Sequence, residues 1–316
     1  MITSVKEILN KAKEGGYAVG AFNTTNLETT WAIVKAAKEM RSPVIIQITE
    51  KTMEYAGGRM IFSIIKNMAE FYAKEIPVGI HLDHGKSFET IQRCAEIGFP
   101  SVMYDGSRKL FEDNVEITKK VVEFAHEKNM AVQGELGSVP YIGETEMGEI
   151  DWDKYMTDPQ QAAQFVKETG IDALAVAIGN AHGFFKERAV PDYARLEAIH
   201  KLVDIPLILH GASDWESEKV KEVIKRGVCC FNVDTATRVS FVNSLIKTVS
   251  DKGGISFDIR QTLGEARIAV KNTVKEKISY FGSEGKAQEN LAITETPNLQ
   301  NSAVAAQARK ASPFLK

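Results

Sequence analysis

Short apolar runs alternate with amphipathic stretches along most of the chain. Each apolar run is brief and continuous, which is typical of strands buried on both faces in a parallel sheet. The stretches between them carry apolar residues at helical spacing, for example over 27–40, 111–128 and 216–227. The expected strands are residues 17–22, 43–49, 77–83, 100–105, 131–136, 173–179, 206–210 and 229–234.

Eight strands that are each followed by a helix predict a (β/α)8 TIM barrel, and an open doubly wound sheet is the alternative. One such barrel accounts for the length of 316 residues, because these folds commonly exceed about 250 residues. Helical periodicity over 257–281 predicts additional C-terminal helices. Since the sequence has no internal repeat or linker, we expect residues 1–296 to form one α/β domain and 297–316 a polar, flexible tail.

Composition narrows the class of protein. The formal net charge is −3, so the overall charge does not favour binding to nucleic acid or to an anionic membrane. The three cysteines have no disulfide or zinc-finger spacing, which fits a reducing compartment. The N-terminal segment is too charged for a signal peptide, and no apolar run is long enough to span a bilayer. We therefore expect a cytoplasmic protein.

Nearly every expected strand ends in a polar or charged residue. In a barrel the C-terminal ends of the strands meet at one rim, and active sites lie there. The polar residues at these ends are Asn23, Thr49, Asp83, His84, Asp105, Glu135, Asn180, His182, His210, Ser213, Asn232 and Asp234.

Three of these strand ends carry a histidine followed by glycine. Neutral imidazole is a common zinc ligand, and catalytic zinc typically keeps three protein ligands and one open position. Any one of these histidines alone would more often be an ordinary core or surface residue, but their shared position predicts that His84, His182 and His210 bind one zinc ion. His81 shares a strand face with Asp83, whereas alternation turns His84 away. We therefore assign His84 to the metal and His81 to packing or to support of a ligand.

The small residues after the last three strands favour phosphate binding. Their backbone N–H groups, hydroxyls and a lysine could hold a phosphate, and barrel enzymes often bind phosphate after strands seven and eight. Ordinary turn chemistry is the alternative, and the sequence has no Walker or dinucleotide glycine motif. The residues concerned are Gly183 with Lys186, Gly211 with Ser213, and the turn 232–235.

Together these features resemble the class II, zinc-dependent fructose-bisphosphate aldolase family, which includes the tagatose-bisphosphate aldolases. The likeness covers most of the chain, from YAVGAFN near the N-terminus to FGSEGKA. Its motifs, in order, are HLDHG (81–85), GELG (134–137), AVAIGNAHG (175–183), LHGAS (209–213) and FNVDTATR (231–238). The resemblance implies a lyase that reversibly cleaves fructose 1,6-bisphosphate to dihydroxyacetone phosphate and glyceraldehyde 3-phosphate through an enediolate stabilised by zinc. Tagatose 1,6-bisphosphate or another ketose bisphosphate is the alternative substrate.

The resemblance also implies a role for each matching residue. His84, His182 and His210 match the zinc ligands, and Glu135 and Asp105 match acidic residues near the metal. A second set matches substrate-binding positions, most of them around the 1-phosphate, with Arg238 as the candidate for the second phosphate. This set is Asn23, Thr49, Gly183, Lys186, Gly211, Ser213, Asn232, Asp234, Thr235 and Arg238.

Proton transfer is assigned by the same resemblance. Asp83 matches the catalytic aspartate, which removes the proton from the C4 hydroxyl. A glutamate on the loop after the fifth strand is the second acid, and Glu144 is the candidate here, with Glu146 next. This loop departs from the family, because residues 139–141 read Val-Pro-Tyr where small residues are usual. Lys86, the pair 108–109 and Asp214 also differ from the family pattern.

The family further implies a sugar bisphosphate as substrate, a homodimer or homotetramer, and a monovalent cation, Na+ or K+, near the phosphate. Two other classes stay open at this point: a non-catalytic aldolase-like subunit and a metal hydrolase on the same barrel. A lysine-based aldolase is disfavoured, because no lysine ends a strand in an apolar setting that would lower its pKa.

Overall fold

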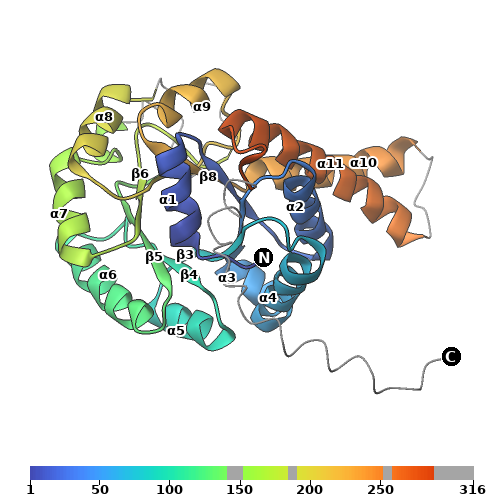
Figure 1. The fold of residues 1–316 in the computed structure, drawn as a ribbon, viewed down its shortest axis with the longest axis horizontal. Helices are drawn as coiled ribbons and strands as arrows, with labels where there is room; N and C mark the ends of the chain where they lie inside the picture. The colour runs from blue at the N-terminus through green and yellow to red at the C-terminus, as the bar shows by residue number, and fades with distance from the viewer. Residues whose placement is uncertain (141–151, 184–190, 252–257, 288–316) are drawn as a thin grey trace, which may run out of the picture.

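The computed structural model describes residues 1–140, 152–183, 191–251 and 258–287. Eight parallel strands follow one another in sequence order around a closed barrel (Figure 1). β1 pairs with β8 and closes the barrel, so the predicted barrel is confirmed and the open doubly wound sheet is wrong. The strands are β1 (Val19–Asn23), β2 (Val44–Thr49), β3 (Val78–Gly85), β4 (Ser101–Tyr104), β5 (Ala131–Leu136), β6 (Ala173–Val176), β7 (Leu207–Leu209) and β8 (Val228–Val233).

Helices surround the barrel, and the expected C-terminal helices are present as α10 and α11, a pair that extends from its side (Figure 1). The helices are α1 (Val5–Gly15), α2 (Leu27–Glu39), α3 (Glu50–Ala56), α4 (Gly58–Asn67), η1 (Met68–Tyr72), α5 (Phe88–Ile97), α6 (Phe111–His126), η2 (Trp152–Lys154), α7 (Pro159–Thr169), α8 (Tyr193–Leu202), α9 (Ser217–Ile224), α10 (Thr235–Asp251) and α11 (Ile259–Phe281).

Several helices begin at a side chain that caps their first turn. The Asn26 side chain accepts a hydrogen bond from the Thr29 backbone N–H at the start of α2, at 2.9 Å. Asp158 does the same for α7 through Gln161 N–H, and Pro159 follows it at the first helical position. These caps satisfy backbone donors that have no partner within the helix. They fix the points at which the chain leaves the rim and enters each helix.

The barrel interior is apolar at one end only. Ile8 and Leu9 of α1 belong to the same buried cluster as the inward-facing Ile45 and Ile208, so α1 closes the N-terminal end of the barrel. On β3, a Cβ added at Gly79 would lie 2.8 Å from a methyl carbon of Val5, which shows how closely α1 approaches. The polar strand ends predicted from the sequence therefore collect at the opposite, C-terminal mouth.

Three further expectations concern membrane-spanning helices, the cysteines and the C-terminal tail. Among the described residues, no helix has both the length and the apolar character needed to cross a membrane. Cys94, Cys229 and Cys230 are all buried free thiols. The predicted domain end at residue 296 and the tail 297–316 lie outside the described residues, so both stay predictions.

Candidate active site and metal centre

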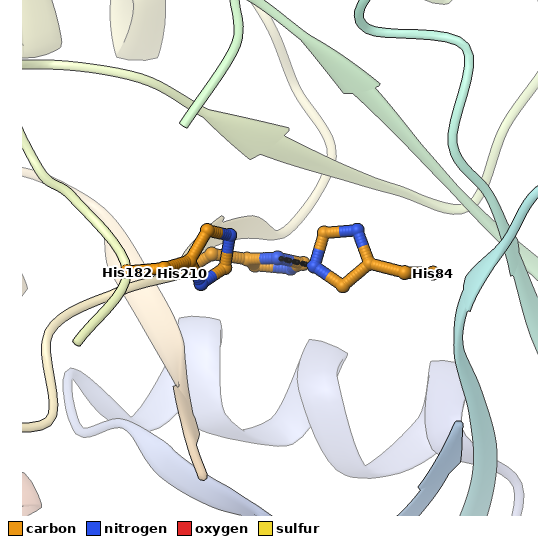
Figure 2. A group of neighbouring side chains, drawn as sticks. All are labelled: His84, His182 and His210. Atoms are coloured by element: carbon orange, nitrogen blue, oxygen red, sulfur yellow. Dashed lines mark hydrogen bonds between the residues drawn. The ribbon is translucent and has the colours of Figure 1, made fainter. Parts of the chain in front are cut away.

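Three imidazole rings face one another at the mouth of the barrel (Figure 2). His84 lies in β3, His182 follows β6 and His210 follows β7, and each ring lies edge-on to the others. The Nε2 atom of His84 is 3.0 Å from Nδ1 of His210. One ring nitrogen from each histidine lies within 4.8 Å of the others. The structure thus brings together the three side chains predicted to bind zinc.

His84 reaches this cluster because β3 is irregular there. Its φ angle is 52°, in the left-handed region, and the pairing of β3 with β4 shifts register between Leu82 and Gly85. Regular alternation would turn His84 away from the face that carries Asp83; the bulge lets both side chains enter the mouth. A Cβ on Gly85 would come within 2.7 Å of the Met103 carbonyl oxygen, so the residue after the bulge must be glycine.

A carboxylate fixes the His84 ring through Nδ1, the ring nitrogen that faces away from His210. Oδ2 of Asp105 lies 2.8 Å from Nδ1 of His84, and the Ser107 hydroxyl donates to Oδ1 of Asp105 at 2.7 Å. Burial alone would lower the pKa of His84, but the charges of Asp83 and Asp105 and the bond to Asp105 raise it to about 10. With Nδ1 occupied, Nε2 is the nitrogen left for a metal ion, an arrangement common among histidine ligands.

Glu135 on β5 places a second carboxylate against the cluster. Its side chain is 2% exposed, and Oε2 lies 3.6 Å from Nδ1 of His210. Burial and the charge of Asp105 raise the pKa of Glu135 to about 8. Within the described part of the chain, Oε2 of Glu135 has no hydrogen-bond partner. A buried carboxylate oxygen in this position is costly unless a cation or proton compensates it.

The third ring, His210, is oriented by two side-chain amides. Its Nε2 lies 2.8 Å from the amide nitrogen of Gln133 and 3.0 Å from that of Asn232. An amide can present either its nitrogen or its oxygen. The nitrogen of the Asn232 amide is identified by its bond to Asp83, so Gln133 is the amide whose orientation can follow the protonation of Nε2 on His210. Burial, together with the neighbouring His84, lowers the pKa of His210 far below its ordinary value and that of His182 to about 4, so both rings stay neutral, as metal binding requires.

Gln133 is absent from the residues predicted for the site. It lies two positions before Glu135 on β5, so the two side chains share the inward face of the barrel. That spacing is the signal in the sequence that could have identified it. His81, which was predicted to pack or to support a ligand, is buried, and its Nδ1 lies 2.8 Å from the Ser101 hydroxyl.

Asp83 is held by one amide on each carboxylate oxygen. Asn23 donates to Oδ2 at 2.7 Å, and Asn232 donates to Oδ1 at 3.1 Å. All three side chains are buried, and Oδ1 of Asp83 lies 3.9 Å from Nε2 of His84. A carboxylate can accept about four hydrogen bonds. The carboxylate of Asp83 therefore keeps room for a substrate proton while its orientation is fixed beside the histidines.

The loops predicted to bind phosphate approach one another closely. Gly183 and Gly211 both have positive φ angles, 98° and 64°. A Cβ on Gly211 would lie 2.3 Å from the Ala181 carbonyl oxygen, so only glycine fits where the two loops meet. The Asn180 side chain donates to the His210 carbonyl oxygen at 2.9 Å and ties the loops together, and Ser213 is buried in the second loop.

The remaining predicted contacts lie around the rim. Asp234 accepts a hydrogen bond from Nε of Arg238 at 2.9 Å, and the Arg238 side chain is 61% exposed. Thr235 is the first residue of α10. Thr49 caps α3 by accepting from the Thr52 backbone N–H at 3.2 Å, so its hydroxyl has a structural partner at this rim.

Three of the sequence-based assignments cannot be placed. Lys186, Glu144 and Glu146 lie outside the described residues.

Comparisons with known proteins agree with this geometry. The family model described as fructose-bisphosphate aldolase class-II matches residues 3–286. The chain is 41% identical over 310 residues to the fructose-bisphosphate aldolase of Thermus caldophilus, a match that covers 91% of this chain and 100% of that protein. It is 40% identical over 287 residues to that of Geobacillus stearothermophilus, covering 90% and 99%. The crystal structure of the YdjI aldolase from Escherichia coli K12 superposes with a TM-score of 0.79 at 33% identity, over 91% of this chain and 100% of that one. The chain therefore belongs to the class II fructose-bisphosphate aldolase family.

Proposed function

We propose that this protein reversibly cleaves fructose 1,6-bisphosphate to dihydroxyacetone phosphate and glyceraldehyde 3-phosphate, with tagatose 1,6-bisphosphate as the second candidate substrate. The observation that carries the proposal is the convergence of three histidines beside Asp83 at the mouth of the barrel. Family membership makes the protein a lyase and implies a divalent metal ion. Zinc is our proposal for that ion, because three imidazole nitrogens with an open position form a typical catalytic zinc site.

The described residues fit such an ion. Three imidazoles converge, two of them neutral, and the buried Oε2 of Glu135 lies beside them without a hydrogen-bond donor in the described part of the chain. We assign His84, His182 and His210 as the ligands, with Glu135 and Asp105 as acidic neighbours. When bound, a divalent ion supplies Lewis-acid polarisation of the ketone next to the bond that breaks.

Asp83 is the proposed general base. Its carboxylate takes the proton from the C4 hydroxyl, the C3–C4 bond breaks, and the bonding electrons remain on C3 while the aldehyde leaves. In the synthetic direction Asp83 returns the proton to the aldehyde oxygen. The amide groups of Asn23 and Asn232 keep the carboxylate aimed in one direction, so little reorientation is needed at either step.

A second group must protonate C3 before dihydroxyacetone phosphate can leave. We assign this step to Glu144, with Glu146 as the alternative, on their position after β5 in the sequence. Replacing each by glutamine separates the two. The variant that lacks the true second acid should lose overall cleavage but retain the earlier steps. The lost step is measured by exchange of a proton on the hydroxymethyl carbon of dihydroxyacetone phosphate with solvent, because this carbon derives from C3 of the ketose.

The phosphate end of the substrate is assigned to the loops after β6, β7 and β8. Support comes from the left-handed glycines 183 and 211 and from the contact between their loops. The proposed 1-phosphate contacts are Gly183, Lys186, Gly211, Ser213, Asn232, Asp234 and Thr235, with Na+ or K+ nearby. Arg238 is assigned to the second phosphate, and Asn23 and Thr49 to other substrate contacts.

We also propose a homodimer or homotetramer in the cytoplasm. The α10–α11 pair extends from the barrel (Figure 1), and its exposed apolar residues include Val242, Ile246, Ile259 and Ile268. Apolar side chains gathered on a projecting element favour contact with another copy. The three buried free cysteines fit a reducing compartment.

The proposed function is tested by side-by-side cleavage of the two bisphosphates. The purified full chain is assayed before and after a chelator and again after zinc is restored. We expect metal-dependent cleavage, with the preferred ketose identified by its larger kcat/KM. An inactive chain that nevertheless binds zinc would instead favour the non-catalytic aldolase-like subunit.

A further inference from the structure

A groove of about 460 Å³ lies between the start of α5 and the face of α6, and none of the active-site residues lines it. We propose that this groove binds a small organic anion that carries a flat aromatic ring, of the nucleoside monophosphate class. Its volume is within the range of about 300–1,000 Å³ that is usual for small-molecule sites.

The floor of the groove is formed by the side chain of Tyr104. Tyr104 is the last residue of β4, and its neighbour Met103 faces the barrel interior, where its sulfur lies 3.6 Å from Gln133. Alternation therefore turns Tyr104 outward to the helices. Tyr104 is 1% exposed and lines the groove. A tyrosine has an apolar ring and a polar hydroxyl group, so this side chain can pack against a ligand and also form a hydrogen bond with it.

The hydroxyl of Tyr104 is a donor at neutral pH. Burial, and after it the charges of Asp105 and Asp113, raise its pKa above the ordinary value of 10. Gly106 makes room for the ring, because a Cβ there would lie 3.0 Å from the Tyr104 ring and still closer to Asn114. The floor thus offers an aromatic surface with one polar atom.

The walls are apolar and one of them is rigid. Phe88 and Ile117 line the two sides, from α5 and α6 respectively. The Phe88 ring lies against Phe124 in an edge contact, with a centroid distance of 5.3 Å. An aromatic ring held in this way offers a flat face on which another ring can pack.

Positive charge surrounds the opening. Lys86, Lys109 and Lys120 all line the groove and are exposed. Lys120 is paired with Glu116 at 2.6 Å, whereas Lys86 and Lys109 have no acidic partner among the described residues. Two uncompensated ammonium groups suit a phosphate, and charge-assisted hydrogen bonds to phosphate are among the strongest in proteins.

Lys86 and Lys109 come from two different loops. The Lys86 backbone N–H donates to Glu50 at 2.8 Å, and the Lys109 N–H donates to the Gly106 carbonyl oxygen at 2.9 Å. Both backbones are therefore fixed before a ligand binds. Because Lys86 lies two residues after His84, the metal content of each variant is measured as a control for an intact site.

The test is calorimetric titration of adenosine monophosphate into the metal-loaded full chain, with adenosine and inorganic phosphate as comparison ligands. We expect millimolar or tighter binding of the monophosphate and weaker binding of each comparison ligand. The Lys86→Ala/Lys109→Ala double variant should bind at least about tenfold more weakly. Tyr104→Phe, which keeps the ring and removes only the hydroxyl group, should bind the monophosphate a few-fold more weakly. Lys119→Ala removes a neighbouring charge of α6 that does not line the groove, and it should bind like the wild type.

The absence of monophosphate binding would overturn the proposal. So would equal affinity in the double variant, because the nucleotide would then bind elsewhere, or equal affinity for inorganic phosphate. Binding rather than cleavage is measured, and the Lys86→Ala/Lys109→Ala variant distinguishes this groove from the phosphate loops of the proposed active site, whose residues it leaves unchanged.

Discussion

At the scale of single residues, the orientation of each histidine depends on one polar neighbour. Asp105 holds Nδ1 of His84, and Gln133 with Asn232 holds Nε2 of His210. These contacts decide which ring nitrogen faces the centre of the cluster. Such supporting groups commonly change metal affinity when they are removed.

Replacing Gln133 by leucine should weaken metal binding by about 10–100-fold. Leucine removes one of the two amide partners of the His210 Nε2 atom and leaves only Asn232, so the ring is held less firmly. Competition with a coloured chelator measures the affinity. Gln133→Glu, which keeps an acceptor at this position, is the matched control, and equal affinity in the leucine variant would contradict the role.

Asp83→Asn should lower kcat by about 10²–10⁴-fold, because an amide cannot take the proton of the C4 hydroxyl. The metal content should stay at the wild-type level, since Asp83 is not an assigned ligand. Steady-state kinetics and elemental analysis on the same sample separate these effects. Retention of wild-type cleavage by this variant would remove Asp83 from the mechanism.

The sequence identified the histidines but not the geometry that joins them. His84, His182 and His210 could be recognised because each ends an apolar run, and strand ends share one rim. The positive φ of His84 could not be foreseen, because alternation predicts the opposite face. Gln133 was missed because its contact with His210 depends on the position of β7 relative to β5, which a single chain does not reveal.

At the scale of elements, the contact between the loops after β6 and β7 holds two of the histidines in place. Gly211 permits that contact, since its φ is 64° and its α-carbon faces the Ala181 carbonyl. The eight strands themselves were predictable to within a few residues, because each is a continuous buried run. The loop conformations were less predictable than the strands, because the close approach at Gly211 involves two segments that are distant in sequence.

Gly211→Ala should destabilise the fold by about 1–3 kcal/mol and weaken metal binding. The added methyl group would meet the Ala181 carbonyl oxygen at 2.3 Å in a backbone conformation that alanine rarely adopts. Gly264→Ala in α11 is the control. Its Cβ meets nothing within 4 Å, so it should raise stability by about 0.4–1 kcal/mol. Thermal unfolding measures both, and an unchanged melting temperature for Gly211→Ala would contradict the packing described.

At the scale of the whole molecule, the end of the barrel opposite to the active site is held by a buried carboxylate. Asp172 accepts hydrogen bonds from Lys6 of α1, His126 of α6 and the Val132 backbone N–H of β5, all within 2.9 Å. It joins elements that are far apart in the sequence. This end therefore serves stability, while the proposed active site lies at the other end.

Asp172→Asn should lower the free energy of unfolding by about 1–3 kcal/mol at neutral pH. Burial alone would raise the pKa of Asp172, but the bonds from Lys6, Val132 and His126 outweigh it and lower the pKa below 3.8. A lowered folded-state pKa gives stability that is present above the unfolded value and lost as pH falls through the folded one. Unfolding is therefore measured at several pH values, and the difference in the free energy of unfolding between variant and wild type should decrease below about pH 4. A gap that is constant with pH would contradict this role.

The most direct test of the central claim is metal content and cleavage measured together on wild type and on His84→Ala. We predict that the wild type binds a single zinc ion, loses fructose 1,6-bisphosphate cleavage with a chelator and regains it with zinc, and that His84→Ala loses both metal and activity. Full cleavage by metal-stripped protein, or activity retained by His84→Ala, would contradict the account.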